Sequence, residues 1–224
     1  MQVDKGAVTI MRVNQRTKFI NEKQVHYTYI ENGSPVICFM FSGAGYTYDK
    51  PLLYYSTMTM LENKYDVVHI HYSYEQDILK LPLADITKII FNDVNPVITE
   101  VLRENQYQEI VFLGKSLGTI PMIHGLMKND MYLNSKMVLL TPLLKYESIY
   151  ETLLICNHSS LIVIGEKDTH YIPSKIESIA IKNNINITKV PNANHSLDIE
   201  PFNTSKSIIA MEKIMKRLNE FLKS

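Results

Sequence analysis

Short apolar runs alternate with longer amphipathic stretches along most of the chain after residue 35. The runs contain few polar residues, which is typical of strands buried on both faces of a parallel sheet. They cover 36–41, 66–72, 109–114, 136–141, 160–165 and 186–190. Apolar side chains recur at helical spacing between and after them, which predicts helices near 51–63, 84–104, 117–128, 145–155, 173–183 and 204–222. Strict alternation of strand and helix indicates an α/β fold whose mostly parallel sheet carries helices on both faces.

Two further strands are predicted at the start of the chain, over 7–13 and 24–31. Asn32 and Gly33 follow the second strand, and this pair marks a turn because both residues tolerate positive φ. We expect the two strands to form an antiparallel edge of the sheet. The sequence contains no internal repeat, low-complexity tract or flexible linker, so we expect one domain over residues 1–224.

The composition argues against nucleic acid and membranes as partners. Lysine plus arginine number 23 and aspartate plus glutamate number 23, so the formal net charge is zero. This balance gives no support to a nucleic-acid surface, which needs a clustered basic excess. The apolar run 36–41 is too short to cross a bilayer, and the N-terminal residues lack the apolar core of a signal peptide. Cys38 and Cys156 are too few for a disulfide framework, so we expect a cytoplasmic protein with no membrane partner.

Residues 109–119, EIVFLGKSLGT, allow two interpretations. Gly-Lys-Ser resembles the end of a P-loop, but the first glycine of that motif would have to occupy position 109, where a glutamate begins a strand-like run. The alternative is G-x-S-x-G, in which a strand enters a sharp turn that presents a serine and continues into a helix. Glycines flank the serine because larger side chains would clash with the neighbouring strand or helix. The apolar residues before Gly114, and Pro121 in the first turn of the predicted helix, favour this second interpretation, with Ser116 as nucleophile.

With this motif after its fifth strand, the chain resembles the α/β-hydrolase superfamily from about residue 24 to its C-terminus. Within that superfamily it resembles the small, nearly lidless serine hydrolases. The resemblance implies an α/β-hydrolase fold with little or no cap. It also implies that nucleophile, acid and histidine follow one another in that order along the chain.

The positions of Asp168 and His195 match that order. Asp168 follows the strand 160–165 and is the expected acid, whereas Glu166 is an alternative that lies earlier in the same loop. His195 follows the last predicted strand and is the expected general base. Six other histidines fit the position less well: His26, His69, His71, His124, His158 and His170.

The resemblance further implies an oxyanion hole made of two backbone amides. One belongs to Leu117, after the nucleophile, and we expect the other at Ala44, with Gly45 or Tyr46 as alternatives. The family often has His-Gly-x-Gly in this loop, whereas the present chain has Ser42 in place of the histidine, which puts the bracing of the loop in question. The candidate substrate-binding residues are Gly43, Gly45 and Tyr46.

Lys115 is a second departure from the family pattern, because many relatives have another polar or an aromatic residue before the nucleophile. It could steer an anionic substrate or pair with a structural acid. We favour the structural role.

The function implied by the resemblance is cleavage of carboxylic esters of small acyl groups, through a Ser-Asp-His triad and an acyl-enzyme. Acyl transfer, thioester or peptide cleavage by the same triad, and a non-catalytic binding role, are the alternatives. The interval 142–159, where this superfamily usually forms a lid, has room for one short helix, so we expect an open site. We expect no metal or cofactor, because His69 and His71 lack the continuation of a two-metal motif and no G-x-G-x-x-G occurs.

Overall fold

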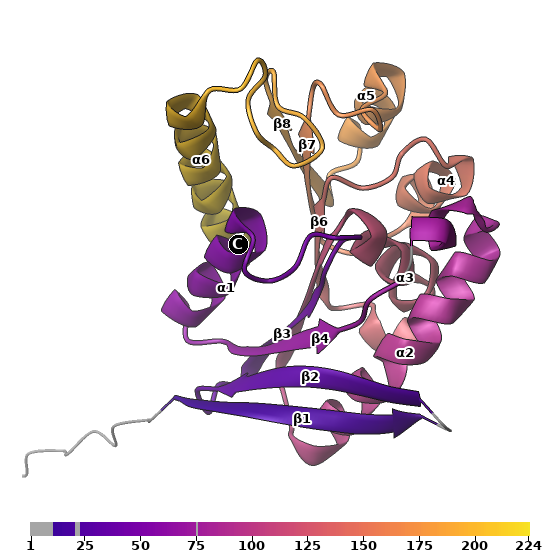
Figure 1. Ribbon diagram of the computed structural model, residues 1–224, viewed down its shortest axis with the longest axis vertical. Helices are drawn as coiled ribbons and strands as arrows, with labels where there is room; N and C mark the ends of the chain where they lie inside the picture. The colour runs from indigo at the N-terminus through magenta and orange to yellow at the C-terminus, as the bar shows by residue number, and fades with distance from the viewer. Residues whose placement is uncertain (1–10, 21–22, 75) are drawn as a thin grey trace, which may run out of the picture.

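The alternating pattern folds into one mixed sheet (Figure 1). The structure, a computed structural model, describes residues 11–20, 23–74 and 76–224. Eight strands within these residues form a sheet in the order β1-β2-β4-β3-β5-β6-β7-β8. The strands are β1 (Arg12–Ile20), β2 (Lys23–Glu31), β3 (Val36–Phe41), β4 (Asp66–His71), β5 (Glu109–Lys115), β6 (Lys136–Leu140), β7 (Ser160–Gly165) and β8 (Ile185–Val190).

The strand directions confirm the expected sheet. β2 pairs antiparallel with both β1 and β4, and every other neighbouring pair is parallel. Parallel neighbours need crossover connections, and each of the five connections from β3 to β8 contains an α-helix. The helices are α1 (Pro51–Glu62), α2 (Leu83–Glu104), α3 (Thr119–His124), α4 (Glu147–Ile155), α5 (Pro173–Ala180) and α6 (Thr204–Leu222).

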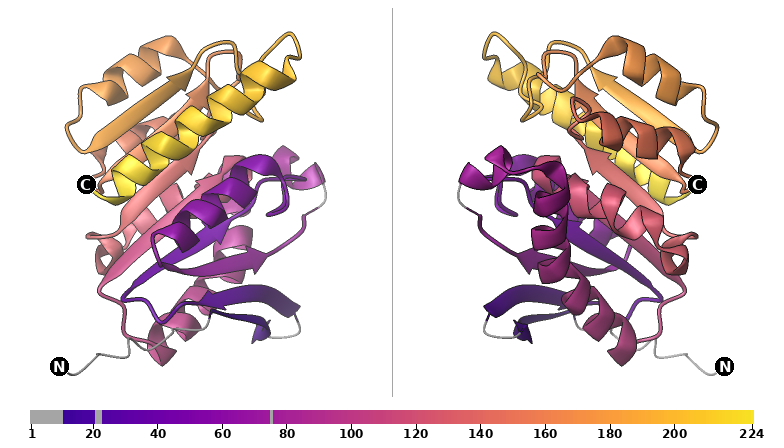
Figure 2. Two further views of the ribbon diagram at one scale, coloured as in Figure 1. Left: turned by 90° about the vertical axis from the view of Figure 1, so that its left-hand side faces the viewer. Right: turned by 90° about the vertical axis from the view of Figure 1, so that its right-hand side faces the viewer.

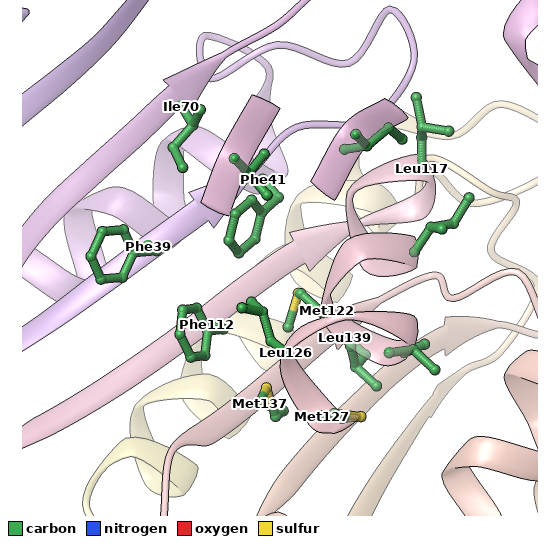
Figure 3. Packing of buried hydrophobic residues seen from close by; sticks show 14 of the residues in the cluster. Phe39, Phe41, Ile70, Phe112, Leu117, Met122, Leu126, Met127, Met137 and Leu139 are labelled. Carbon is green, nitrogen blue, oxygen red and sulfur yellow. The ribbon is translucent and has the colours of Figure 1, made fainter. Parts of the chain in front are cut away.

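Helices cover both faces of the sheet, and each face has its own apolar core. Figure 1 shows α1 and α6 on one side and α2 to α5 on the other, and Figure 2 shows each side in turn. Phe39, Phe41 and Phe112 pack on the α2 to α5 side (Figure 3), where the rings of Phe39 and Phe112 lie 5.7 Å apart between centroids. Cys38 and Met40 alternate with them along β3 and pack on the α1 and α6 side. β3 is therefore buried on both faces, as its continuous apolar run predicts.

The predicted position of the first strand was wrong. Residues 7–10 lie outside the described residues, and β1 continues to Ile20 rather than ending at residue 13. Its inward positions include Arg16 and Lys18, which form ion pairs with Glu104 and Glu100 of α2. A strand held by ion pairs has no apolar alternation, so the hydrophobic pattern could not reveal it.

The continuous helix predicted over 117–128 was also wrong. The segment consists of the 3-10 turn η2 (Ser116–Gly118), the short helix α3 and a second 3-10 turn, η3 (Leu126–Lys128). The break falls at Gly125, where an added Cβ would collide with the ring of Phe91 on α2. Close packing against α2 therefore requires a residue without a side chain at the position where α3 ends.

The six parallel strands, β3 to β8, present their carboxyl ends at the same edge of the sheet, and the loops that leave this edge carry the candidate residues. Between β6 and β7 the chain forms α4 and short connections, with no cap in the described structure. Among the described residues, no helix combines the length and the hydrophobicity that a membrane-spanning segment needs.

Candidate active site

Ser116 lies at a sharp turn between β5 and α3. Its φ is 51°, in the left-handed region that residues other than glycine rarely adopt. This strained geometry is expected of a nucleophile elbow, which exposes a serine hydroxyl above the sheet. Glu109 is the first residue of β5 and lies in a strand, so the P-loop interpretation does not apply.

The two glycines around Ser116 make the turn sterically possible. A Cβ on Gly114 would lie 2.6 Å from the carbonyl oxygen of Gly118. A Cβ on Gly118 would lie 2.7 Å from the carbonyl oxygen of Ser42 and even closer to that of Phe41. Apart from Met122 Sδ, which would lie 2.5 Å from a Cβ on Gly114, these obstacles are backbone atoms, which cannot move aside as a flexible side chain could. The clash inferred from the sequence motif is therefore confirmed.

The structure brings Ser116, Asp168 and His195 together although they come from three separate loops. The Oγ of Ser116 lies 2.8 Å from Nε2 of His195, and Nδ1 of His195 lies 2.7 Å from Oδ2 of Asp168. An ionised carboxylate only accepts hydrogen bonds, so Nδ1 carries the proton of the neutral imidazole. Nε2 is then free to accept the proton of the serine hydroxyl.

The environment of Asp168 favours its ionised form. Its side chain has no solvent exposure. Burial by itself would raise the pKa of Asp168, but the hydrogen bond from His195 and one of 2.8 Å from the backbone N–H of His170 hold this pKa below its usual value. Glu166, the alternative acid, is exposed to solvent at the start of the same loop.

The loop that carries His195 is ordered by its own hydrogen bonds and by the neighbouring loop. The Asn194 side-chain oxygen accepts from the backbone N–H groups of Ser196 and Asp198, at 2.9 and 3.1 Å. The N–H of Lys167, beside the acid, donates to the carbonyl of Ala193 at 2.8 Å. A backbone hydrogen bond thus links the loop that carries Asp168 directly to the loop that carries His195.

The loop after β3 forms a tight turn beside the serine. Gly43 and Tyr46 exchange two backbone hydrogen bonds, of 3.2 and 3.3 Å, which leaves Ala44 and Gly45 at the tip. Gly45 has a φ of 64°, which its missing side chain permits. A Cβ on Gly43 would lie 3.5 Å from the Cβ of Ser116, so the turn passes close to the serine.

Tyrosines brace this loop where the family often has a histidine. The hydroxyl of Tyr72 donates to the carbonyl of Ser42 at 2.7 Å. The hydroxyl of Tyr46 accepts from the N–H of Leu52 at 3.1 Å and joins the loop to α1. The substitution at Ser42 therefore leaves a supported turn.

A sequence comparison identifies the family of this chain. The profile described as "Alpha/beta hydrolase domain" matches residues 36–223, most of the sequence. The chain belongs to the alpha/beta hydrolase family. No curated protein matches the hydrolase in a sequence search.

Solved structures with the same fold include esterases and a lidless enzyme. An esterase from Pyrococcus furiosus is 13% identical with a TM-score of 0.69, covering 95% of the hydrolase and 92% of the esterase. A serine hydrolase without a lid from Xanthomonas campestris is 10% identical with a TM-score of 0.69, covering 94% of each chain. Est1E from Butyrivibrio proteoclasticus, with ferulic acid bound, is 10% identical with a TM-score of 0.64, covering 91% of the hydrolase and 99% of Est1E. At such identities these similarities establish the fold.

Lys115 of the hydrolase is only 2% exposed and lies beneath the site. Among the described residues its ammonium bonds to the carbonyl of His195 at 3.2 Å, with the Thr141 hydroxyl 3.4 Å away, and not to a carboxylate. The expected structural acid is therefore not its hydrogen-bond partner. Its burial nevertheless favours a structural role over direct contact with a substrate.

The two histidines on β4 have local hydrogen-bond partners. His69 contacts the hydroxyl of Thr57 at 2.9 Å and His71 that of Thr28 at 2.7 Å. In the part of the chain that the structure describes, no three His, Cys, Asp or Glu side chains are grouped to hold a metal. His170 is among the histidines that fit the catalytic position less well, but it follows Asp168 by two residues and its ring centroid lies 5.4 Å from that of His195.

Proposed function

We propose that the hydrolase cleaves carboxylic esters of small acyl groups, with Ser116 as nucleophile, His195 as general base and Asp168 as the acid that orients it. The observation that supports this most directly is the 2.8 Å distance between Ser116 Oγ and His195 Nε2. His195 takes the serine proton as Oγ attacks the ester carbonyl, and Asp168 stabilises the imidazolium that forms. The C–O bond to the alcohol then breaks as His195 gives its proton to the leaving oxygen, which leaves the acyl-enzyme. Water attacks the acyl-enzyme, again with His195 as base, and releases the carboxylic acid and the Ser116 hydroxyl.

The amides of Leu117 and Ala44 are the proposed oxyanion donors. Leu117 follows the serine in the elbow, and Ala44 lies at the tip of the turn beside it. Gly43 has its N–H bonded to Tyr46, so Ala44 suits the role better than Gly43. One such donor typically lowers the barrier by about 3 kcal/mol. The proposed substrate site also includes the rest of this loop, which would lie beside the reacting carbonyl: Gly43, Gly45 and Tyr46.

The accessibility of the site favours substrates that are small or whose ester group is exposed. The side chain of His195 is 35% exposed, and α4 is the one helix between β6 and β7 in the described structure. Est1E, which shares the fold, binds ferulic acid, a small carboxylic acid. These observations favour an ester with an accessible carbonyl over a lipid chain held in a deep tunnel.

The test is Ser116→Ala against a series of p-nitrophenyl esters of increasing acyl length. We expect the variant to lose about 10³-fold or more in kcat, because it lacks the attacking oxygen. A fluorophosphonate probe should label the wild-type protein at Ser116 and leave the variant unlabelled. Ser174→Ala, an exposed serine on α5, is the matched control and should retain both properties. A folded wild-type protein that is neither labelled nor active would instead support a non-catalytic binding role.

A further inference from the structure

The buried side chain of Lys115 contacts three segments of the site that are separate in sequence. Lys115 is the last residue of β5 and immediately precedes the serine. Its Nζ donates to the backbone carbonyl of His195 at 3.2 Å and lies 3.4 Å from the hydroxyl of Thr141, just after β6. The same Nζ lies 4.5 Å from the centroid of the Tyr46 ring, in the loop after β3. One ammonium thus contacts the histidine loop, the proposed oxyanion loop and the end of β6.

Burial of the Lys115 ammonium has a desolvation cost. Lys115 is 2% exposed, and removal of a charged group from water is unfavourable unless its partners compensate. An uncharged side chain of similar length could occupy the same volume without that penalty. The contacts of the charge are therefore what distinguishes lysine at this position.

We propose that Lys115 is a positioning residue: its ammonium holds the backbone of His195 and the ring of Tyr46 against the elbow, and thereby keeps imidazole and oxyanion loop aligned with Ser116. This inference rests on the proposed function. A displacement of about 1 Å between reacting groups can lower a rate by about 10²-fold, so a loosened histidine loop should reduce turnover.

The protonation of Lys115 gives this arrangement a pH dependence. Burial lowers the pKa of Lys115 to about 8, although Asp168 opposes the shift. Loss of the proton removes the cation–π attraction to Tyr46 and weakens the hydrogen bond to His195.

The other charged or titratable groups around Lys115 are Asp168, His170, His195 and Tyr46. Burial lowers the pKa of His170 to about 4, whereas burial raises the pKa of Tyr46. The pKa of Asp168 lies below its usual value. The shifts move the pKa values of Asp168 and His170 to lower pH, and that of Tyr46 to higher pH, than the pKa of Lys115. We therefore assign to Lys115 any loss of activity as the pH rises through about 8.

The experiment compares Lys115→Met with Lys136→Met. Methionine fills a similar volume without charge, so Lys115→Met should lower kcat by about 10- to 100-fold with KM changed less than about 3-fold. Its melting temperature should equal or exceed that of the wild type, because the buried charge is gone. Lys136 also donates to backbone carbonyls, those of Leu222 and Ser224 at 2.8 and 3.1 Å, but at the opposite edge of the sheet. Lys136→Met should keep the wild-type kcat.

The pH profile distinguishes positioning from packing. The wild type and Lys136→Met should lose activity as the pH rises through about 8, and Lys115→Met should lack this decline because it resembles the deprotonated state. A Lys115→Met protein with wild-type kcat and an unchanged alkaline decline would overturn the proposal.

Hydrogen exchange measures the contact without relying on activity. Amides of residues 192–199 should exchange faster in Lys115→Met than in the wild type or Lys136→Met. If the wild type neither hydrolyses esters nor reacts at Ser116, the proposed function fails, and equal exchange in the variants would show that the contact fails too. If Lys115→Met does not fold, the wild type at about pH 7 and about pH 9 provides the same comparison. Corrected for intrinsic rates, exchange of this loop should rise with pH, and constant exchange would refute the role.

Discussion

The hydrogen-bonded pair of Asp168 and His195 illustrates what single residues contribute. The carboxylate determines which imidazole nitrogen carries the proton, and the geometry leaves Nε2 facing Ser116 at 2.8 Å. Glu166 has the same functional group two residues earlier, but its side chain faces solvent. Asp168 is therefore preferred to Glu166 as the proposed acid because of the burial and direction of its side chain, since the functional group is the same.

Replacement of the acid by its amide should abolish this control. Asp168→Asn preserves the shape but can donate to Nδ1 and so favours the wrong imidazole tautomer. We expect kcat to fall by about 10³- to 10⁴-fold. Glu166→Gln is the matched control and should change kcat less than about 3-fold. Steady-state kinetics on a p-nitrophenyl ester measures both, and equal losses in the two variants would contradict the assignment of Asp168.

The turn between β5 and α3 shows how an element positions a residue. Ser116 adopts a φ of 51° because Gly114 and Gly118 allow the strand, the turn and the helix to approach closely. The end of β3 lies against Gly118, so the elbow and the loop after β3 share one tightly packed contact. A methyl group at this point would push the two segments apart.

Two glycine substitutions separate close packing from backbone strain. A Cβ on Gly118 would collide with backbone atoms, so we expect Gly118→Ala to lower the free energy of unfolding by about 3 kcal/mol or more. Gly45 has free space around it but a φ of 64°, so Gly45→Ala should cost only about 1 kcal/mol. Urea unfolding measures both values. A loss in Gly118→Ala no larger than in Gly45→Ala would show that the contact is less tight than the structure indicates.

At the scale of the whole molecule, ionic contacts join the antiparallel edge to the parallel part of the fold. Glu100 of α2 pairs with Lys18 of β1 and accepts a hydrogen bond of 2.9 Å from the hydroxyl of Tyr27 on β2. Burial opposes ionisation of Glu100, but these two partners hold its pKa below the usual value. The ionised carboxylate of Glu100 therefore contributes to the contact between the edge hairpin and α2.

This contact predicts a loss of stability in acid. A carboxyl group whose pKa is lower in the folded state stabilises the protein above its unfolded pKa, and this stabilisation is lost as the pH falls through the folded value. We expect the free energy of unfolding to decrease between about pH 6 and about pH 3, and Glu100→Gln to show a smaller decrease. The difference should be about 1 kcal/mol or less, as is typical of a partly exposed pair.

Urea titrations at both pH values measure this difference. Glu212→Gln, an exposed carboxylate on α6, is the control and should follow the wild type. A Glu100→Gln protein with the same acid sensitivity as the wild type would show that this ion pair does not contribute.

The sequence by itself determined the class of fold and indicated the proposed nucleophile, and the chain order implied by the family resemblance added Asp168 and His195 as the other proposed triad residues. Apolar runs separated by amphipathic stretches require strands buried between helices, because only burial of both patterns removes their apolar side chains from water. The G-x-S-x-G motif was equally informative, because its glycines report steric limits that act within a few residues. Both signals depend on residues that are close in the chain, so they can be recognised without knowledge of the neighbouring elements.

Only the tertiary structure decided what depends on contacts between distant segments. The glycine at the end of α3 makes room for the ring of Phe91, and β1 pairs with β2 over its whole length and forms ion pairs with α2. The partners of Lys115 come from loops that are separate in sequence and meet because parallel strands bring their carboxyl ends to one edge. A buried charge is defined by its surroundings, and no pattern along the chain specifies which carbonyl or ring will lie beside it.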